Sequence, residues 1–179
     1  MIPVFLANGF EEIEALATVD ILRRAGVEVV TVGVGGRNAV GAHGIAVCAD
    51  IVEDELDIAA IDGVVLPGGM PGTTNLEASA VVQTAVKSAY ERGLLVAAIC
   101  AAPSILGHGG YLNGKKATCY PGFEPELTNA AVINEGVVRD GSIITASGAG
   151  VAVDFALELV RYLVSDEMAD SIRGGIQCR

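Results

Sequence analysis

The sequence predicts an α/β fold, a mostly parallel sheet with helices on both faces. Segments typical of strands and of helices alternate along all 179 residues, and repeated strand–helix units form parallel sheets with right-handed connections. Hydrophobic residues make up 51% of the chain and the mean hydropathy is +0.52, which fits strands buried on both faces. The longest apolar stretch, Leu94 to Leu106, is shorter than the ~18 residues of a membrane-spanning helix, so we expect no membrane association.

The first half of the chain alternates apolar runs with turn signals. The spacing of apolar residues predicts strands over residues 2–7, 27–34 and 62–66, a helix over 11–24, and a small hairpin from 39–40 and 45–48. Ala25-Gly26 ends the helix, and the turn Gly35 to Asn38 separates the second strand from the hairpin. The third strand ends at Pro67-Gly68-Gly69.

The second half continues this alternation. A helix is predicted over 81–92, where Gly93 stops it, and the apolar strand that follows ends at Cys100. Short strands are expected over 117–119, 131–133, 137–139 and 142–146, then a long helix over 150–164 and a turn or two of helix over 167–172. We find no internal repeat, low-complexity tract or linker, so residues 1–179 are expected to form a single domain.

The segment Leu94 to Pro103 carries the strongest functional signal. Its apolar run ends in Cys100, and Ala101-Ala102-Pro103 lead into a helix-compatible run, so the cysteine lies on a sharp corner between strand and helix. The helix N-terminus favours thiolate over thiol, and such a corner lifts the side chain into a cleft, as in the nucleophile elbow of hydrolases. On this interpretation Cys100 is reactive and the most acidic of the four thiols. The alternative is a small buried hydrophobe.

Ligands of such sheets bind outside the carboxyl ends of the strands, where three segments are expected to meet. The first strand leads into residues 8–14, the third into Gly68-Gly69, and the fourth into Cys100. Glu14 lies among apolar residues, so we expect it to point inward and to have a raised pKa. We expect Glu14 to be protonated near neutral pH while Cys100 is a thiolate, with one proton shared by the pair. Gly68-Gly69 is either a plain tight turn or a source of N–H groups for an oxyanion.

Charge and cysteine usage narrow the function classes. Eleven basic against twenty-two acidic residues give a net charge of −11, which argues against nucleic acid as the main ligand. Two of the acids, Glu11 and Glu12, fit the first turn of a helix, where negative charge interacts favourably with the helix dipole. The four cysteines, at positions 48, 100, 119 and 178, have no metal-ligand spacing. The N-terminus has no basic region and soon meets acidic residues, so we expect no signal peptide, a cytoplasmic location and reduced thiols.

Five segments, in order and spread over nearly the whole chain, carry a family resemblance: Gly9 to Glu14, Asp20 with Arg23 to Gly26, Leu66 to Gly69, Ala97 to Pro103, and Gly148 to Gly150 before Asp154-Phe155. The chain resembles the DJ-1/ThiJ/PfpI superfamily, and within it the branch of the parkinsonism-associated protein and its bacterial relatives. The resemblance implies a flavodoxin-like three-layer sandwich and a homodimer. It also implies that Cys100 is the oxidisable nucleophile, that Glu14 is the acid beside it, and that Gly69 and Ala101 supply N–H groups facing the reacting oxygen.

Two positions depart from the family pattern. Tyr120 stands where many relatives carry a histidine before a proline. A phenol with a pKa near 10 is a poor base, so the third member of a Cys–His–acid triad is missing or replaced. His43 stands where relatives often place an arginine-containing turn, and it either supplies part of a positive charge or is an exposed hairpin residue. His108, before Gly109-Gly110, is expected at the surface near a helix end.

Two functions from different classes follow. The first is a glutathione-independent glyoxalase or deglycase without cofactor or metal: Cys100 adds to the aldehyde of a 2-oxoaldehyde such as methylglyoxal, Glu14 moves a proton, and water releases a 2-hydroxy acid. The second is a redox sensor or stress chaperone whose Cys100 is oxidised to sulfinate. A peptidase is a weaker alternative, since protease-like relatives place a histidine where Ala101 follows the cysteine here. The expected partners are a small carbonyl substrate and a second copy of the chain.

Overall fold

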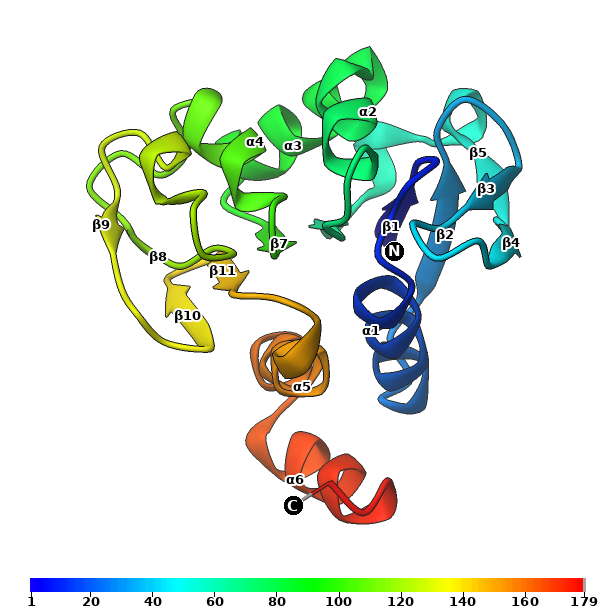
Figure 1. Cartoon of the computed structure of the whole chain (residues 1–179). Helices are drawn as coiled ribbons and strands as arrows, with labels where there is room; N and C mark the ends of the chain where they lie inside the picture. Colours follow the sequence, from blue (N-terminus) through cyan, green and yellow to red (C-terminus); the bar gives the residue numbers. More distant parts are fainter. Residues whose placement is uncertain (179) are drawn as a thin grey trace.

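The computed structural model describes residues 1–178, which contain a central sheet of seven strands. The strands lie in the order β10-β11-β7-β6-β1-β2-β5 (Figure 1). Their bounds are Ile2–Leu6 (β1), Val29–Gly33 (β2), Ile51–Val52 (β5), Gly63–Leu66 (β6), Leu95–Ile99 (β7), Val137–Asp140 (β10) and Ile143–Ala146 (β11). Neighbouring strands are parallel except β10 and β11, which pair antiparallel at one edge. The strand order reverses at β1, which pairs with both β2 and β6, and such a reversal is where ligand sites form.

Helices cover both faces of this sheet. One face carries α1 (Glu12–Arg24), α5 (Ala152–Leu163) and α6 (Asp166–Gly175), and the other carries α2 (Gly72–Ala78), α3 (Ala80–Glu91) and α4 (Pro103–His108) (Figure 1). Strand β7 supplies both layers, because successive side chains of a strand point to opposite faces. Ala97 and Ile99 pack in the cluster beneath α1 and α5, whereas Val96 and Ala98 pack in the cluster beneath α3 and α4.

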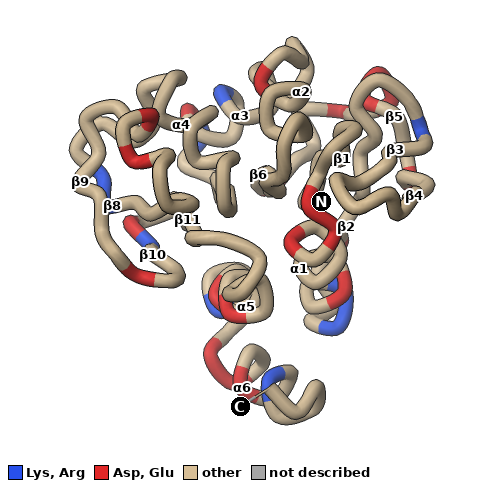
Figure 2. The backbone as a smooth tube through the Cα atoms, in the orientation of Figure 1, with Lys and Arg blue, Asp and Glu red and all other residues tan. Residues whose placement is uncertain are grey.

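Helix α1 shows how sequence sets the orientation of a helix beside the site. Acidic residues occupy its first turn and Arg23 and Arg24 its last, in accord with the helix dipole (Figure 2). Leu22 is fully buried against the sheet, while Ile13 and Leu16 are 58% and 37% exposed on the opposite side. The helix therefore has an apolar outer face as well as a buried one.

Shorter elements decorate the edges of the sheet. A hairpin pairs β3 with β4 and a small parallel pair joins β8 to β9. The remaining bounds are Asn38–Val40 (β3), Ala46–Cys48 (β4), Lys116–Ala117 (β8) and Ala131–Val132 (β9), with single turns of 3₁₀ helix at Glu53–Glu55, Ile58–Ala60, Glu124–Glu126 and Ala149–Val151. Among the helices described in residues 1–178, none combines the length and apolar character needed to cross a membrane.

The fold class predicted from sequence is confirmed, with three differences in detail. Helix α2 was not predicted, because Gly72-Thr73-Thr74-Asn75 has low helix propensity; buried Leu76 anchors it instead. The two-residue strand β5 was too short to stand out. Helix α6 continues to Gly175, well past the turn or two that were expected, because Ser165 caps its start and Ala169 and Ile172 are buried.

Candidate active site

Loops that follow β1, β6 and β7 converge at the carboxyl edge of the sheet, as predicted. The loops after β1 and β6 are joined by backbone hydrogen bonds: the Glu11 N–H donates to the Gly68 carbonyl at 2.9 Å, and the Gly72 N–H donates to the Gly9 carbonyl at 3.1 Å. Gly69 has a φ of +90°, and an added Cβ would lie 2.5 Å from the Glu11 nitrogen. The loop thus needs glycine at that position.

Cys100 lies on the predicted corner, directly after β7 and three residues before α4 begins. Its φ of +66° is in the left-handed region, which a residue with a side chain occupies at a cost of about 1–3 kcal/mol. Two hydrogen bonds hold the backbone there: its N–H donates to the Ala146 carbonyl, and its carbonyl accepts from the Tyr120 N–H, both at 2.8 Å. The sulfur is half-buried, and the nearby N–H groups of Gly69 and Ala101 act to lower the pKa of the thiol.

Glu14 points inward from α1, as predicted, and is 1% exposed. Its Oε2 accepts a hydrogen bond from the Gly68 N–H at 2.8 Å, while Oε1 is buried without a hydrogen bond of ordinary geometry. Burial raises the pKa of this carboxyl group to about 7, against the opposing effects of the Gly68 N–H and the Cys100 thiol. Glu14 therefore gains and loses its proton near neutral pH.

The thiol of Cys100 is less acidic than the sequence predicted. Burial raises its pKa to about 12, together with the negative charge of ionised Glu14; the N–H groups of Gly69 and Ala101 oppose this rise only in part. The expectations that Cys100 is the most acidic of the four thiols and that it is a thiolate near neutral pH are thus wrong for the state in which Glu14 is ionised. Two negative charges cannot share this pocket, so the pair carries at most one near neutral pH.

Gly68 brings the acid and the thiol together. A Cβ added at this position would lie 2.6 Å from the Cys100 Cβ and 2.8 Å from the Glu14 Oε2. No L side chain fits that space, so glycine is required for the carboxyl group to reach the sulfur. Gly68-Gly69 is therefore more than a tight turn: Gly68 leaves room for the two side chains to meet, and the N–H of Gly69 acts to lower the pKa of the thiol.

Tyr120 and His43 do not enter the centre of this arrangement. Tyr120 is 50% exposed, and its ring lies 3.3 Å from where a Cβ on Gly148 would be. It contributes to the site through its backbone N–H on the Cys100 carbonyl. The side chain of His43 is 69% exposed and faces Glu11 and Glu12, and hydrogen bonding to Glu12 raises its pKa.

Glu12 has a role that sequence reasoning missed. It is buried and holds the turn of the β3–β4 hairpin: its Oε1 accepts from the His43 N–H at 2.8 Å, and its Oε2 lies 2.8 Å from His43 Nδ1. Burial opposes ionisation, but these hydrogen bonds together lower its pKa to about 2. The dipole interpretation of Glu12 was therefore incomplete, because the hairpin that covers this carboxylate is distant in sequence.

Glu11, Glu12 and His43 are also the group of potential metal ligands in the described part of the chain whose donor atoms lie within 4.8 Å of one another. Glu12 already accepts backbone N–H groups through Oε1 and contacts the histidine through Oε2. These oxygen atoms already hold the hairpin turn in place, and we assign no metal to them.

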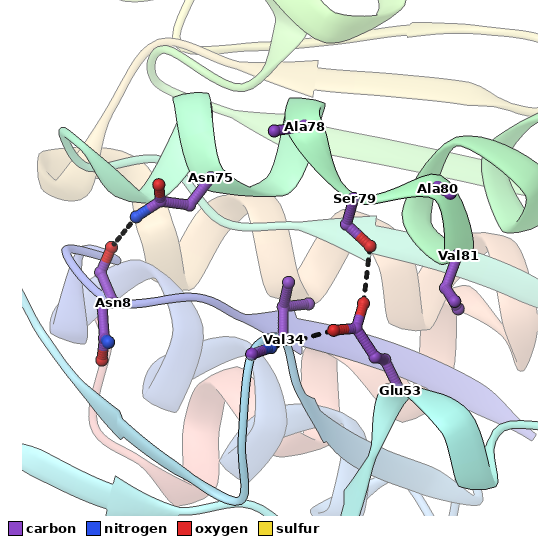
Figure 3. Close-up of a pocket in the computed structure, with 9 residues that line it drawn as sticks. Asn8, Val34, Glu53, Asn75, Ala78, Ser79, Ala80 and Val81 are labelled. Carbon is purple, nitrogen blue, oxygen red and sulfur yellow. Dashed lines mark hydrogen bonds between the residues drawn. The ribbon is translucent and has the colours of Figure 1, made fainter.

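A cavity of about 530 Å³ lies between the ends of β1 and β2 and helices α2 and α3 (Figure 3). Its carboxylate, Glu53, accepts hydrogen bonds from the Ser79 hydroxyl at 2.6 Å and the Gly35 N–H at 2.9 Å. On its other side the Asn75 amide donates to the Asn8 carbonyl at 2.8 Å. Both oxygens of Glu53 thus already accept hydrogen bonds from the protein, whereas Glu14 is the carboxyl group beside the Cys100 thiol.

Comparisons with known proteins find similarity over most of the chain. The model of the DJ-1/PfpI family matches residues 1–162. Protein dj-1beta of Drosophila melanogaster is 37% identical over 97% of this chain and 94% of its own length. Glutathione-independent glyoxalase DJR-1.2 of Caenorhabditis elegans is 30% identical over 90% of this chain and 87% of its own length. The solved structure described as Toxoplasma gondii DJ-1, oxidized, superposes with a TM-score of 0.95 at 34% identity, covering 98% of this chain and 97% of that one.

Proposed function

The chain belongs to the DJ-1/PfpI family, and from that premise we propose that it is a cofactor-independent enzyme that converts 2-oxoaldehydes such as methylglyoxal to 2-hydroxy acids. This activity is of the glutathione-independent glyoxalase or deglycase type. The observation that carries the proposal is the buried pair of Glu14 and Cys100, an acid with a pKa of about 7 beside a thiol whose sulfur faces two backbone N–H groups. The name of the Caenorhabditis elegans relative supports it.

The first step is addition of sulfur to the aldehyde. Ionised Glu14 takes the thiol proton as the Cys100 sulfur bonds to the aldehyde carbon, and it then gives this proton to the resulting oxyanion, which forms a hemithioacetal and leaves Glu14 ionised again. The carboxylate is the base because its pKa is near neutral, whereas burial and the charge of Glu14 raise the pKa of the thiol too far for it to ionise unaided. The N–H groups of Gly69 and Ala101 stabilise negative charge first on sulfur and then on the adduct oxygen.

The second step is a proton shift between the two carbons. Glu14 removes the proton from the carbon that bears sulfur and returns a proton to the neighbouring carbonyl carbon through an enediol. The first carbon is oxidised to a thioester and the second is reduced to an alcohol, so no outside electron acceptor is needed. Water then cleaves the thioester, which releases the 2-hydroxy acid and restores the Cys100 thiol.

We also propose that two copies of the chain associate. Ile13 and Leu16 on α1 are exposed beside the exposed hairpin residues Val40 and Ile45, and apolar residues gathered on one face favour burial by a partner. The hairpin adjoins α1 through the contacts of Glu12 with His43. A cytoplasmic location and a single domain over 1–179 remain predictions from the sequence.

The second candidate function is redox sensing, in which Cys100 is oxidised by peroxide to sulfinate and the output is binding. The solved Toxoplasma gondii relative is described as oxidized, which supports oxidation chemistry in the family. A protonated Glu14 can donate a hydrogen bond to a sulfinate oxygen, and the Gly69 N–H can donate another. The peptidase alternative lacks a histidine after the cysteine, where Ala101 stands.

Turnover of methylglyoxal without glutathione tests the proposal. Wild type should form the 2-hydroxy acid, Cys100→Ser should not, and Cys48→Ser, which changes an exposed cysteine, should retain activity. A wild type without hydroxy-acid formation contradicts the enzyme proposal. If peroxide-treated wild type then prevents aggregation of a client protein and Cys100→Ser does not, the sensor function replaces it.

A further inference from the structure

A second cavity, of about 300 Å³, lies between α2, α4 and the loop that follows Tyr120. Its wall includes Met70, directly after Gly69, and Ser104, whose hydroxyl donates to the Ala101 carbonyl at 2.8 Å. Gly122 and Phe123 form the side nearest Tyr120 in sequence. The two segments whose N–H groups act on the Cys100 sulfur, and the segment whose N–H bonds the Cys100 carbonyl, therefore continue along the chain into the walls of this cavity.

Thr73 supplies an unused polar group to the cavity. The residue is 3% exposed, and its Oγ1 is buried without a hydrogen-bond partner in the described structure. Buried hydroxyl groups almost always have a partner, because an unsatisfied one loses its hydrogen bonds to water without replacement. A ligand hydroxyl that displaces the side chains covering this oxygen would satisfy it as donor or acceptor.

Two carboxylates and a histidine frame the cavity. His108 bridges Glu77 and Glu126, with its Nδ1 2.6 Å from Glu77 Oε1 and its Nε2 2.8 Å from Glu126 Oε2. This bridge joins α2 to the 3₁₀ turn at 124–126, so the cavity is held between fixed walls. Each carboxylate commits one oxygen to His108 and has a second that can accept a hydrogen bond from a ligand hydroxyl.

We propose that this cavity binds the hydroxylated carbon chain of the substrate, so that the enzyme prefers 2-oxoaldehydes with a polyhydroxylated tail over those with a methyl or apolar one. The inference rests on the proposed function for its substrate class. The reactive aldehyde lies at Cys100, and the tail extends past Met70 and Ser104 toward Thr73. Met70 and Phe123 contact the carbon chain, and Thr73, Glu77 and Glu126 hydrogen-bond its hydroxyl groups.

Turnover of three probes tests the substrate preference: methylglyoxal, phenylglyoxal as an apolar bulky 2-oxoaldehyde, and 3-deoxyglucosone as a six-carbon 2-oxoaldehyde with hydroxyl groups. Wild type should show the highest kcat/KM for 3-deoxyglucosone. Thr73→Val keeps the shape of the side chain and removes the hydroxyl, so it should lower the ratio of kcat/KM for 3-deoxyglucosone to that for methylglyoxal about fivefold, the worth of one ordinary hydrogen bond. Thr84→Val, which removes an exposed hydroxyl bonded within α3, should leave the ratio unchanged.

Binding to Cys100→Ser separates this inference from the proposed function. Addition of 3-deoxyglucosone should shift the backbone amide signals of Thr73 and Ser104 in the NMR spectrum, whether or not wild type turns the compound over. Shifts at these residues, with no turnover of any of the three probes by wild type, would leave the cavity assignment standing and overturn the glyoxalase function. Turnover of methylglyoxal with no such shifts would overturn the cavity assignment. An equal fall in kcat/KM for 3-deoxyglucosone and methylglyoxal in Thr73→Val would overturn it as well.

Discussion

Replacing Glu14 with glutamine should change how the stability of the protein depends on pH. The amide has nearly the shape of the carboxyl group and can still accept the Gly68 N–H at the position of Oε2, but it does not titrate. Glu14 is 1% exposed, and burial raises its pKa to about 7. In the unfolded chain the same group has its ordinary pKa of 4.5.

The sign follows from proton linkage. Between pH 4.5 and 7 the folded protein holds this proton and the unfolded chain has lost it, so the free energy of unfolding falls as the pH rises. At about 1.4 kcal/mol for each pH unit, wild type loses about 3.5 kcal/mol across this window through Glu14 alone. Below pH 4.5 both states are protonated, and above pH 7 both are ionised, so the loss is confined to the window. Glu14→Gln should therefore gain about 3.5 kcal/mol relative to wild type between pH 4.5 and 8.

Urea denaturation followed by circular dichroism measures this difference, since the chain has no tryptophan. Protein concentration is held constant, because association would add to the apparent stability. Glu135→Gln, which removes an exposed carboxylate, controls for the loss of one charge. Cys100→Ala keeps the burial of Glu14 and should keep most of the slope. A difference between Glu14→Gln and wild type that stays constant within about 0.5 kcal/mol from pH 4.5 to 8 would refute the raised pKa and, with it, the role of Glu14 as a base.

Three further predictions follow from the site and the outer face of α1. The kcat/KM for methylglyoxal should rise with pH through an apparent pKa near 7, that of Glu14; Glu14→Gln should lose turnover yet still oxidise at Cys100 with peroxide, as mass spectrometry can establish. Gly68→Ala, whose Cβ would lie 2.6 Å from the Cys100 Cβ, should lose turnover and melt at a lower temperature, whereas Gly174→Ala, with nothing within 4 Å, should do neither. Ile13→Lys places a charge at a 58% exposed apolar position and should shift the protein from dimer to monomer in sedimentation; an unchanged dimer would place the interface elsewhere.

The sheet could be predicted because strands buried on both faces appear in the sequence as continuous apolar runs. The residues of β7, Leu95 to Ile99, are all apolar, and the glycine before them ends the preceding helix. Helix α2 has no comparable signal in its sequence. Its residues have low helix propensity, and it is held by contacts that only the folded chain supplies, among them the Thr73 N–H on the Gly69 carbonyl at 2.8 Å.

The meeting of Glu14, Gly68 and Cys100 was also predictable, because the carboxyl ends of parallel neighbours share one edge of the sheet. The pKa of Cys100 was not. A helix start predicts a lowered pKa for a thiol, but α4 begins only at Pro103 and has six residues. The depth of burial and the charge of Glu14 both raise the pKa, and both depend on how closely α1 packs against the loop at Gly68.

The position of one proton connects the two functions proposed for this site. When Glu14 is ionised, its charge raises the pKa of the Cys100 thiol, which keeps sulfur protonated and slow to react with peroxide, since peroxide attacks the thiolate. The same carboxylate is then ready to accept the thiol proton as a carbonyl carbon approaches. When the proton moves to Glu14, sulfur becomes a thiolate that two backbone N–H groups stabilise. Because a pKa of about 7 lets Glu14 either hold or accept a proton near neutral pH, the two proposed reactions can use the same carboxyl group, and the reagent that arrives decides between them.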